Sequence, residues 1–216
     1  MRAGQRKVRW TQSESVRHSK TPPNNVEFVP ENYCAPLDLD KVFSRRAPLE
    51  IDVGSGAGAF LVAMTQRFPT RNFLGLERML GRIRKSCGAI SRHGLSNVRI
   101  LRIESTYAVR YMLPPESVTI FHVAFPDPWP KRRHWPRRLI NDEFLDAIVA
   151  ALAPSGELRL KTDDAPYFTH MRAAIAKRED FREIEWPDDP AYPETNFERT
   201  FRMAGLPIYR LRLVKV

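Results

Sequence analysis

Two stretches of the chain combine residue types that could do chemistry. The first, Asp52-Val53-Gly54-Ser55-Gly56-Ala57-Gly58, sets a carboxylate before three glycines at the end of an apolar run. Glycines let the backbone take positive φ and come close to a ligand. The second, about seventy residues later, is Phe125-Pro126-Asp127-Pro128-Trp129, a carboxylate between two prolines with an aromatic ring after it. Their order and spacing predict a nucleoside cofactor at one strand end and a nucleic-acid base at a neighbouring one.

The glycine stretch fits both nicotinamide dinucleotide and S-adenosylmethionine binders. Asp52 favours S-adenosylmethionine, because a carboxylate repels a pyrophosphate and attracts the cationic methionine end of a sulfonium ligand. Glu77 ends the next apolar run and could accept hydrogen bonds from both ribose hydroxyls, although NAD-binding proteins use the same device. Glu104 follows a third run, where an adenine amino group would lie.

The proline-flanked stretch is typical of a stiff loop. Pro126 and Pro128 restrict φ and remove two backbone donors, which would hold Asp127 and Trp129 at a set height above a strand end. Trp129 could stack on a base. An ionised Asp127 only accepts hydrogen bonds, so it suits the N1–H and amino group of guanine, or an amine about to be methylated. The alternative is a structural Pro–Trp corner.

A basic run follows this loop in a chain whose net charge is +10. Cations with aromatic residues among them favour nucleic-acid binding over a merely solvated charge run. Phosphate contacts would also make that binding depend on salt. The residues predicted to contact RNA phosphates are Arg132, Arg133, Arg137 and Arg138.

The elements that must position these residues alternate from Leu49 onward. Apolar runs predict strands at 49–53, 72–76, 98–103, 118–124 and 157–161, and helical periodicity predicts helices at 58–68, 79–93, 139–152 and 165–177. This alternation predicts an α/β fold with a mostly parallel twisted sheet and helices on both faces. Late strands at 181–186 and 208–214, with no helical pattern between them, predict an antiparallel C-terminal edge hairpin.

The remaining composition sets the domain organisation. Residues 1–45 are predicted to be a basic, partly flexible N-terminal arm, and residues 46–216 a single domain. With 43% hydrophobic residues the chain is not a disordered protein. No apolar run approaches the ~20 residues of a membrane span, and the N-terminus lacks the apolar segment of a secretory signal. Cys34 and Cys87 make neither a disulfide framework nor a four-ligand zinc site. We therefore expect a cytoplasmic protein without a metal.

With these residues in place, the chain resembles the bacterial tRNA (guanine-N7)-methyltransferase family from about Leu49 to the C-terminus. The likeness rests on the glycine and proline stretches together with Leu74-Gly75-Leu76-Glu77, Lys161-Thr162-Asp163 and Thr195-Asn196-Phe197-Glu198. The proline stretch and the last motif are the specific ones. The resemblance implies a Rossmann-like class I methyltransferase fold, S-adenosyl-L-methionine as cofactor, tRNA as partner, and methylation of guanine N7 in the variable loop.

The resemblance also implies roles for particular residues. Asp127 matches the catalytic position. The cofactor-binding set, from the loop and the resemblance together, is Asp52, Gly54, Gly56, Gly58, Glu77, Glu104 and Asp127. The substrate-binding set is Lys131, Asp163, Thr195, Asn196, Phe197 and Glu198. Three residues depart from the usual family pattern: Glu104 replaces an Asp, Pro130 a His, and Asn196 a Lys, which removes a cation from the substrate side.

The expected reaction asks little of the protein beyond alignment. Guanine N7 has a free in-plane lone pair, so no proton must leave before attack, and neither a general base nor a metal is expected. We expect Asp127 to anchor the guanine, with Asp163 and Glu198 orienting a base that has left its stack. Three alternatives stay open: methylation of another RNA or of an exocyclic base amine, an NAD(P)-dependent oxidoreductase, and a catalytically silent RNA-binding subunit. The sequence leaves the choice between monomer and homodimer open.

Overall fold

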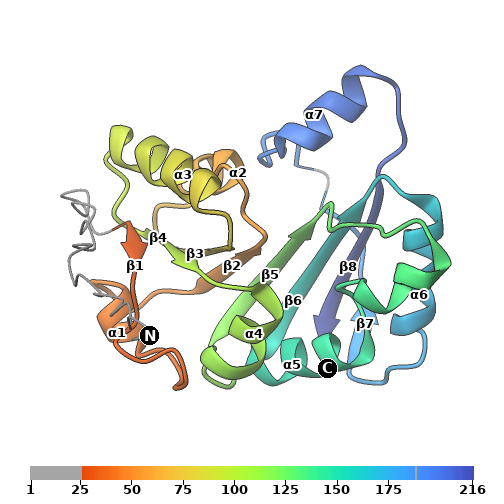
Figure 1. Ribbon diagram of the computed structural model, residues 1–216, viewed down its shortest axis with the longest axis horizontal. Coiled ribbons are helices and arrows are strands. Elements are labelled where there is room, and N and C mark those ends of the chain that lie inside the picture. Colours follow the sequence, from red (N-terminus) through yellow and green to blue (C-terminus); the bar gives the residue numbers. More distant parts are fainter. Residues whose placement is uncertain (1–25, 188) are drawn as a thin grey trace, which may run out of the picture.

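A computed structural model describes residues 26–187 and 189–216 of the chain, and these form a mixed sheet with helices on both faces (Figure 1). The strands are β1 (Glu27–Phe28), β2 (Leu49–Val53), β3 (Asn72–Glu77), β4 (Val98–Arg102), β5 (Val118–Ala124), β6 (Leu152–Thr162), β7 (Phe181–Glu183) and β8 (Tyr209–Lys215). The α-helices are α1 (Leu39–Val42), α2 (Ala59–Arg67), α3 (Leu80–Arg92), α4 (Ser105–Tyr107), α5 (Asp142–Ala151), α6 (Ala165–Ile175) and α7 (Asn196–Met203). A π-helix, η1 (Ala108–Met112), and a 3₁₀ helix, η2 (Arg132–Arg137), complete the set.

The strand order β1-β4-β3-β2-β5-β6-β8-β7 confirms the predicted architecture. Strands β1 to β6 pair in parallel, whereas β8 runs antiparallel to both β6 and β7. The order reverses at β2, which lies between β3 and β5, and such a switch point is where open α/β sheets bind ligands. Val53 and Val123 are partners in register, so the loops that leave β2 and β5 start side by side.

Two apolar cores lie on opposite faces of the sheet because side chains alternate along each strand. The larger core packs Ile51, Val53 and Phe121 against η1, α5 and α6. The smaller core packs Phe73 and Ile100 against α2 and α3. Gly75 belongs to this second face, where an added Cβ would lie 2.5 Å from Leu61 Cδ1. A side chain there would push α2 off the sheet.

The second face changes character beyond α2, where the centre of the sheet carries buried charges. Asp52, His122, Arg159 and Arg212 are successive register partners across β2, β5, β6 and β8. At one end Phe60 of α2 contacts His122, with ring centroids 5.2 Å apart. Further along, Trp186 and Tyr192 lie over Arg159, and Arg159 Nη1 donates a 2.7 Å hydrogen bond to Tyr192 Oη.

The segment before β2 differs from the expected arm. Residues 27–28 form β1, which pairs in parallel with β4 at the sheet edge, and Val26, Leu37, Val42 and Phe43 are buried. A two-residue strand and a four-residue helix are too short to produce a periodic pattern, so neither leaves a signal in the sequence. The rest of the expected arm, residues 1–25, lies outside the described residues.

The C-terminal region differs in one further element. The expectation that no helix separates the last two strands is wrong, because α7 occupies residues 196–203. Thr195 opens it with a capping box, in which its hydroxyl accepts from the Glu198 N–H and the Glu198 carboxylate accepts from the Thr195 N–H. In Figure 1, α7 stands away from the sheet, beyond the ends of β5 and β6. Among the described residues, no helix is both long and apolar enough to cross a membrane.

Candidate active site

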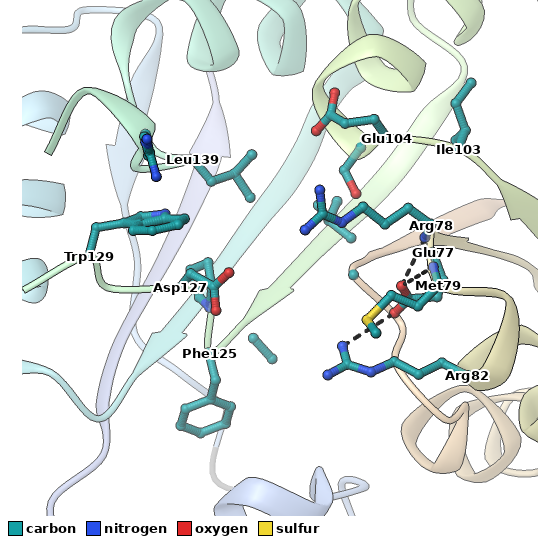
Figure 2. A pocket seen from close by; sticks show the side chains of 16 residues that line it. Glu77, Arg78, Met79, Arg82, Ile103, Glu104, Phe125, Asp127, Trp129 and Leu139 are labelled. Carbon is teal, nitrogen blue, oxygen red and sulfur yellow. Dashed lines mark hydrogen bonds and ion pairs between the residues drawn. The ribbon is translucent and has the colours of Figure 1, made fainter. Parts of the chain in front are cut away.

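A cavity of about 360 Å3 opens at the carboxyl ends of the strands next to the switch point (Figure 2). The loops after β2, β3, β4 and β5 all contribute to it. Its lining residues are Val53, Gly54, Glu77, Arg78, Met79, Arg82, Ile103, Glu104, Ser105, Ala124, Phe125, Pro126, Asp127, Trp129, Arg137 and Leu139. The cavity therefore joins the two stretches that the sequence singled out.

The glycine loop builds one end of the cavity with backbone alone. Gly54, Gly56 and Gly58 all have positive φ, at 77°, 57° and 80°, a region that L side chains avoid. Only Gly54 lines the cavity. Gly56 donates its N–H to Glu77, 3.0 Å away, and an added Cβ at Gly58 would lie 2.6 Å from Ser86 Oγ on α3. Gly56 and Gly58 thus shape the turn and let α2 and α3 approach.

Glu77 is buried at the end of β3 and held by its own surroundings. Its Oε2 accepts from Gly56 N, and its Oε1 accepts from Arg78 N and Met79 N at 2.8 Å each. Arg82 Nη1 lies 3.7 Å from the same carboxylate. Three backbone donors fix the orientation of this carboxylate at the cavity wall.

Glu104 is held in a similar way at the end of the next strand. It is the N-cap of α4, and its two oxygens accept from Thr106 N at 3.0 Å and Tyr107 N at 2.8 Å. The side chain also lines the cavity, on the same wall as Ile103 (Figure 2). A cap that faces a cavity keeps an acceptor in place before any ligand arrives.

Asp52 lies beneath the cavity rather than in its lining. Its side chain points to the charged second face of the sheet and is 5% exposed. Burial, and then the nearby Glu77, raise the pKa of Asp52 to about 7, while Lys161 acts in the opposite direction. Asp52 does not line the cavity, so its place among the cofactor-binding residues stays a prediction, and its charge lies close enough to Glu77 to influence the wall.

The loop after β5 holds its residues by strained backbone. Phe125 and Trp129 have φ values of 55° and 46°, which cost about 1–3 kcal/mol each for a residue with a Cβ. Phe125 N donates to Lys161 O at 2.8 Å, and Arg138 Nε donates to Pro128 O at 2.8 Å. Asp127, between these anchors, is exposed at the cavity mouth and has no hydrogen-bond partner among the described residues. Trp129 stands beside it (Figure 2).

The basic run divides into exposed and buried members. Lys131, Arg132, Arg133 and Arg137 are exposed around η2, as phosphate contacts require. Arg138 is not. It is 2% exposed, and besides its bond to Pro128 O its guanidinium lies 4.7 Å from the ring of Trp135 and 4.9 Å from that of Tyr167. The prediction that Arg138 contacts phosphate is wrong, because this residue fixes the loop from inside.

The last predicted substrate residues gather at the ends of β6 and α7 but do not line the cavity. Asp163 is exposed directly after β6. Glu198 is buried, and its Oε1 accepts from Lys161 Nζ at 2.6 Å. Together with Thr195 it ties α7 to the sheet. Asn196 and Phe197 face outward, Phe197 with 60% of its surface exposed and its ring 5.7 Å from that of Phe125.

Several lining residues were not predicted. Arg78, Met79 and Arg82 follow β3, and Ile103 and Leu139 supply apolar wall. The helix after β3 must start at the cavity in a parallel sheet, so its first turn was a usable signal for the first three. The sequence indicates Ile103 and Leu139 only as parts of a strand and a helix. Within residues 26–187 and 189–216, no cluster of His, Cys, Asp and Glu side chains is arranged to hold a metal.

Comparison with known proteins gives matches over most of the chain. The family model described as "Putative methyltransferase" matches residues 46–211. A tRNA (guanine-N(7)-)-methyltransferase of Syntrophotalea carbinolica is 33% identical over 183 residues, 83% of this chain and 79% of that one. Its counterpart in Leifsonia xyli subsp. xyli is 37% identical over 180 residues, 81% of this chain and 79% of that one.

Solved structures show the same fold at lower identity. The 16S rRNA methyltransferase KamB superposes with a TM-score of 0.60 at 19% identity, covering 83% of this chain and 94% of that one. The aminoglycoside resistance methyltransferase NpmB1 gives 0.56 at 18% identity, covering 83% and 92%. The architecture around the cavity is thus that of a class I methyltransferase.

Proposed function

The chain belongs to the family of tRNA (guanine-N(7)-)-methyltransferases, and we propose that it transfers a methyl group from S-adenosylmethionine to N7 of a guanosine in the variable loop of tRNA. One observation carries the proposal beyond the likeness. A carboxylate without a partner among the described residues, Asp127, stands on a strained loop at the mouth of a cavity whose opposite wall holds two prearranged carboxylates. The protein acts in the cytoplasm, where its substrate is found.

The cavity fits the cofactor. Its volume is within the ~300–1,000 Å3 of small-molecule sites. A carboxylate offers about four lone-pair sites, so Glu77, with three backbone donors, keeps capacity for a ribose hydroxyl. Glu104 is available to the adenine amino group, and Met79, Ile103 and Leu139 give apolar walls to the ring. When bound, the cofactor supplies an electrophilic methyl group on its sulfonium.

The glycine loop would receive the cationic end of the cofactor. Gly54 lets the backbone come close there, and Asp52 acts from below through its charge. Burial opposes the ionised form of Asp52, whereas a nearby cationic ligand favours it. Attraction between the ionised carboxylate and the cation would then contribute to ligand binding. Gly56 and Gly58 contribute by shaping the loop rather than by contact.

The substrate approaches from the other side of the cavity. Asp127 accepts hydrogen bonds from the N1–H and amino group of the target guanine, and Trp129 stacks on a base. Lys131, Arg132, Arg133 and Arg137 contact phosphates along the strand. Asp163, Asn196 and Phe197 border the same side from β6 and α7.

These residues perform the reaction mainly by placement. N7 carries no proton, so Asp127 orients the base without having to remove one. The stiff loop keeps Asp127 and Trp129, and with them the guanine ring, at one height. The lone pair of N7 then points along the line of displacement. Well-oriented groups of this kind replace a bimolecular encounter by an effectively unimolecular step.

The decisive experiment incubates the full chain with labelled S-adenosylmethionine and unmodified bulk tRNA, and analyses the nucleosides of the product. We expect labelled 7-methylguanosine, and none after Asp127→Ala. Label on an exocyclic nitrogen would instead show an amine methyltransferase. Cofactor binding with no labelled guanosine would overturn the proposal and favour another RNA or a silent subunit.

A further inference from the structure

We propose that the exposed face of α3 is a second phosphate-binding surface, which guides tRNA to the cavity from the side opposite the Lys131–Arg137 run. This α3 basic face consists of Arg82, Arg84, Lys85 and Arg92. The inference rests on the proposed function, because it takes tRNA as the polyanion.

The sequence around α3 is charged with one sign only. The 26 residues between Glu77 and Glu104 include seven arginines and lysines and no aspartate or glutamate. A helix that only needs to be soluble mixes signs, because pairs of opposite charge three or four residues apart stabilise it and like pairs destabilise it. Arg82 and Lys85 are such a like pair. The one-sided charge weakens the free helix and suits an external anion.

Burial divides α3 into two faces of different composition. Ile83, Ser86, Cys87 and Ile90 are buried against the sheet and α2. The other α3 residues outside this buried set are Leu80, Gly81, Gly88, Ala89 and Ser91, of which Gly81 alone is exposed. An added Cβ at Gly81 would meet nothing within 4 Å, so packing within the described residues does not require this glycine. Small residues between cations leave room for a sugar-phosphate backbone to come close.

The cations of this face are not used up by acids of the protein. Arg82 lies 3.7 Å from Glu77, and no ion pair involving Arg84, Lys85 or Arg92 exists within the described part of the chain. Guanidinium and ammonium groups on a helix surface without acidic partners are available for phosphate oxygens.

The position of this face relative to the cavity gives it a function. Arg78 and Arg82 line the cavity, and both side chains reach toward the loop that carries Asp127 (Figure 2). From Arg82 to Arg92 the face continues away from the cavity for about 15 Å. Lys131 and Arg137 lie on the far side, next to Trp129. A polyanion that crosses the cavity mouth therefore meets positive charge before and after the target base.

The test removes two charges that lie outside the cavity. In the full chain, Lys85→Gln/Arg92→Gln is compared with Lys177→Gln/Arg182→Gln, a pair that is also exposed, near the end of α6 and on β7, the edge strand at the far end of the sheet from β1 and β4 (Figure 1). Binding of unmodified tRNA is measured from 0.05 to 0.3 M salt, and methyl transfer is measured with the same RNA.

We expect the α3 pair to lower the slope of log affinity against log salt by roughly 1.4–1.8, since each lost contact removes about 0.7–0.9. The KM for tRNA should rise on the order of tenfold at 0.15 M salt, with kcat and cofactor affinity unchanged. The control pair should behave as the parent.

Different results would overturn the α3 surface and the proposed function. If the parent forms 7-methylguanosine and the α3 pair keeps its slope and KM, the α3 surface is overturned and the proposed function stands. If the parent neither binds nor methylates tRNA, both are overturned. A slope lowered equally by the control pair would show a general charge effect and would also overturn the α3 surface.

Discussion

The two sides of the cavity hold their carboxylates in opposite ways. On the side of β3 and β4, Glu77 accepts three backbone N–H groups and Glu104 accepts two. On the side of β5 and β6, Asp127 and Asp163 are exposed and accept no hydrogen bond from any residue that the structure describes. The side that we propose for the cofactor thus has its carboxylates held before a ligand arrives, whereas the side that we propose for the substrate leaves its carboxylates open for one.

The backbone conformation also differs between the two sides of the cavity. The cofactor side takes positive φ at glycines, where it costs little, whereas the substrate side takes it at Phe125 and Trp129, where a Cβ makes it costly. A loop strained in this way persists only when its surroundings hold it, here through Lys161 O and the buried Arg138. Rigidity therefore comes from hydrogen-bonded side chains on one side and from an anchored backbone on the other.

Asp127→Asn is the variant with the largest expected effect, and it tests whether the substrate side depends on a free carboxylate. The variant keeps size and loop but replaces an acceptor by an amide that cannot accept from both guanine donors. We expect kcat/KM for tRNA to fall about 10²–10³-fold, the loss typical of one essential electrostatic contact, with the free energy of unfolding unchanged. Single-turnover methyl transfer and urea denaturation measure the two quantities. Full turnover in this variant would mean that the free carboxylate is not the anchor.

A second test concerns the buried pair that holds α7. Lys161→Met removes the nearest cation of the buried Glu198 carboxylate and leaves only Arg210, 3.7 Å away, and the loss of a buried partner costs up to about 3–5 kcal/mol of unfolding free energy. The double variant Lys161→Met/Glu198→Leu removes both charges and should recover part of this loss. Urea denaturation of the two single variants, the double variant and the parent gives the coupling. Additive losses would show that the pair is not coupled.

These two regions also differ in how far the sequence predicts them. Parallel strands end at one edge of a sheet, so an acid after each apolar run could be assigned to the cofactor side from order alone, as Glu77 and Glu104 were. Prediction of the substrate side requires knowing which side chain of the charged run at 131–138 is buried. Nothing within Lys131 to Arg138 indicates that Arg138 packs between Trp135 and Tyr167, because Tyr167 is remote in sequence.

The missed helix α7 shows a different limit. Thr195 and Glu198 are spaced as a capping box, which is a signal of a helix start. The family resemblance assigns residues 195–198 to substrate contact, and that interpretation hid the signal of a helix start. The partner that buries Glu198 is Lys161, 37 residues earlier. Such a pairing follows from topology and not from any window of sequence.

A third prediction uses the pKa of Asp52, which is raised to about 7 in the folded chain. Between pH 4 and 7 the folded state then binds more protons than the unfolded state, so this residue lowers stability as the pH rises. Asp52→Asn should remove this slope and make the ligand-free protein roughly 4 kcal/mol more stable than the parent above pH 7, and equally stable near pH 4. Thermal unfolding at both pH values measures the difference. Parallel stability curves for parent and variant would contradict it.

The raised pKa of Asp52 also predicts how cofactor affinity depends on pH. A cationic ligand favours the ionised carboxylate, so cofactor affinity should rise as the pH rises through 7 in the parent and stay flat in Asp52→Asn. Calorimetric titration in buffers of different ionisation enthalpy would show proton release on binding in the parent alone. Equal release in both would assign the proton to another group.

The smallest expected effect separates the two jobs of Glu104. As N-cap of α4 it satisfies two backbone donors, and loss of a cap costs about 1 kcal/mol. Glu104→Ala should therefore lose both that stability and cofactor affinity, whereas Glu104→Asp, a shorter acid that caps well, should keep the stability within ~0.5 kcal/mol. If alanine weakened cofactor binding with no loss of unfolding free energy, the carboxylate would not be held by the helix. The contrast between carboxylates held by backbone N–H groups on the cofactor side and open carboxylates on the substrate side would then rest on Glu77 alone.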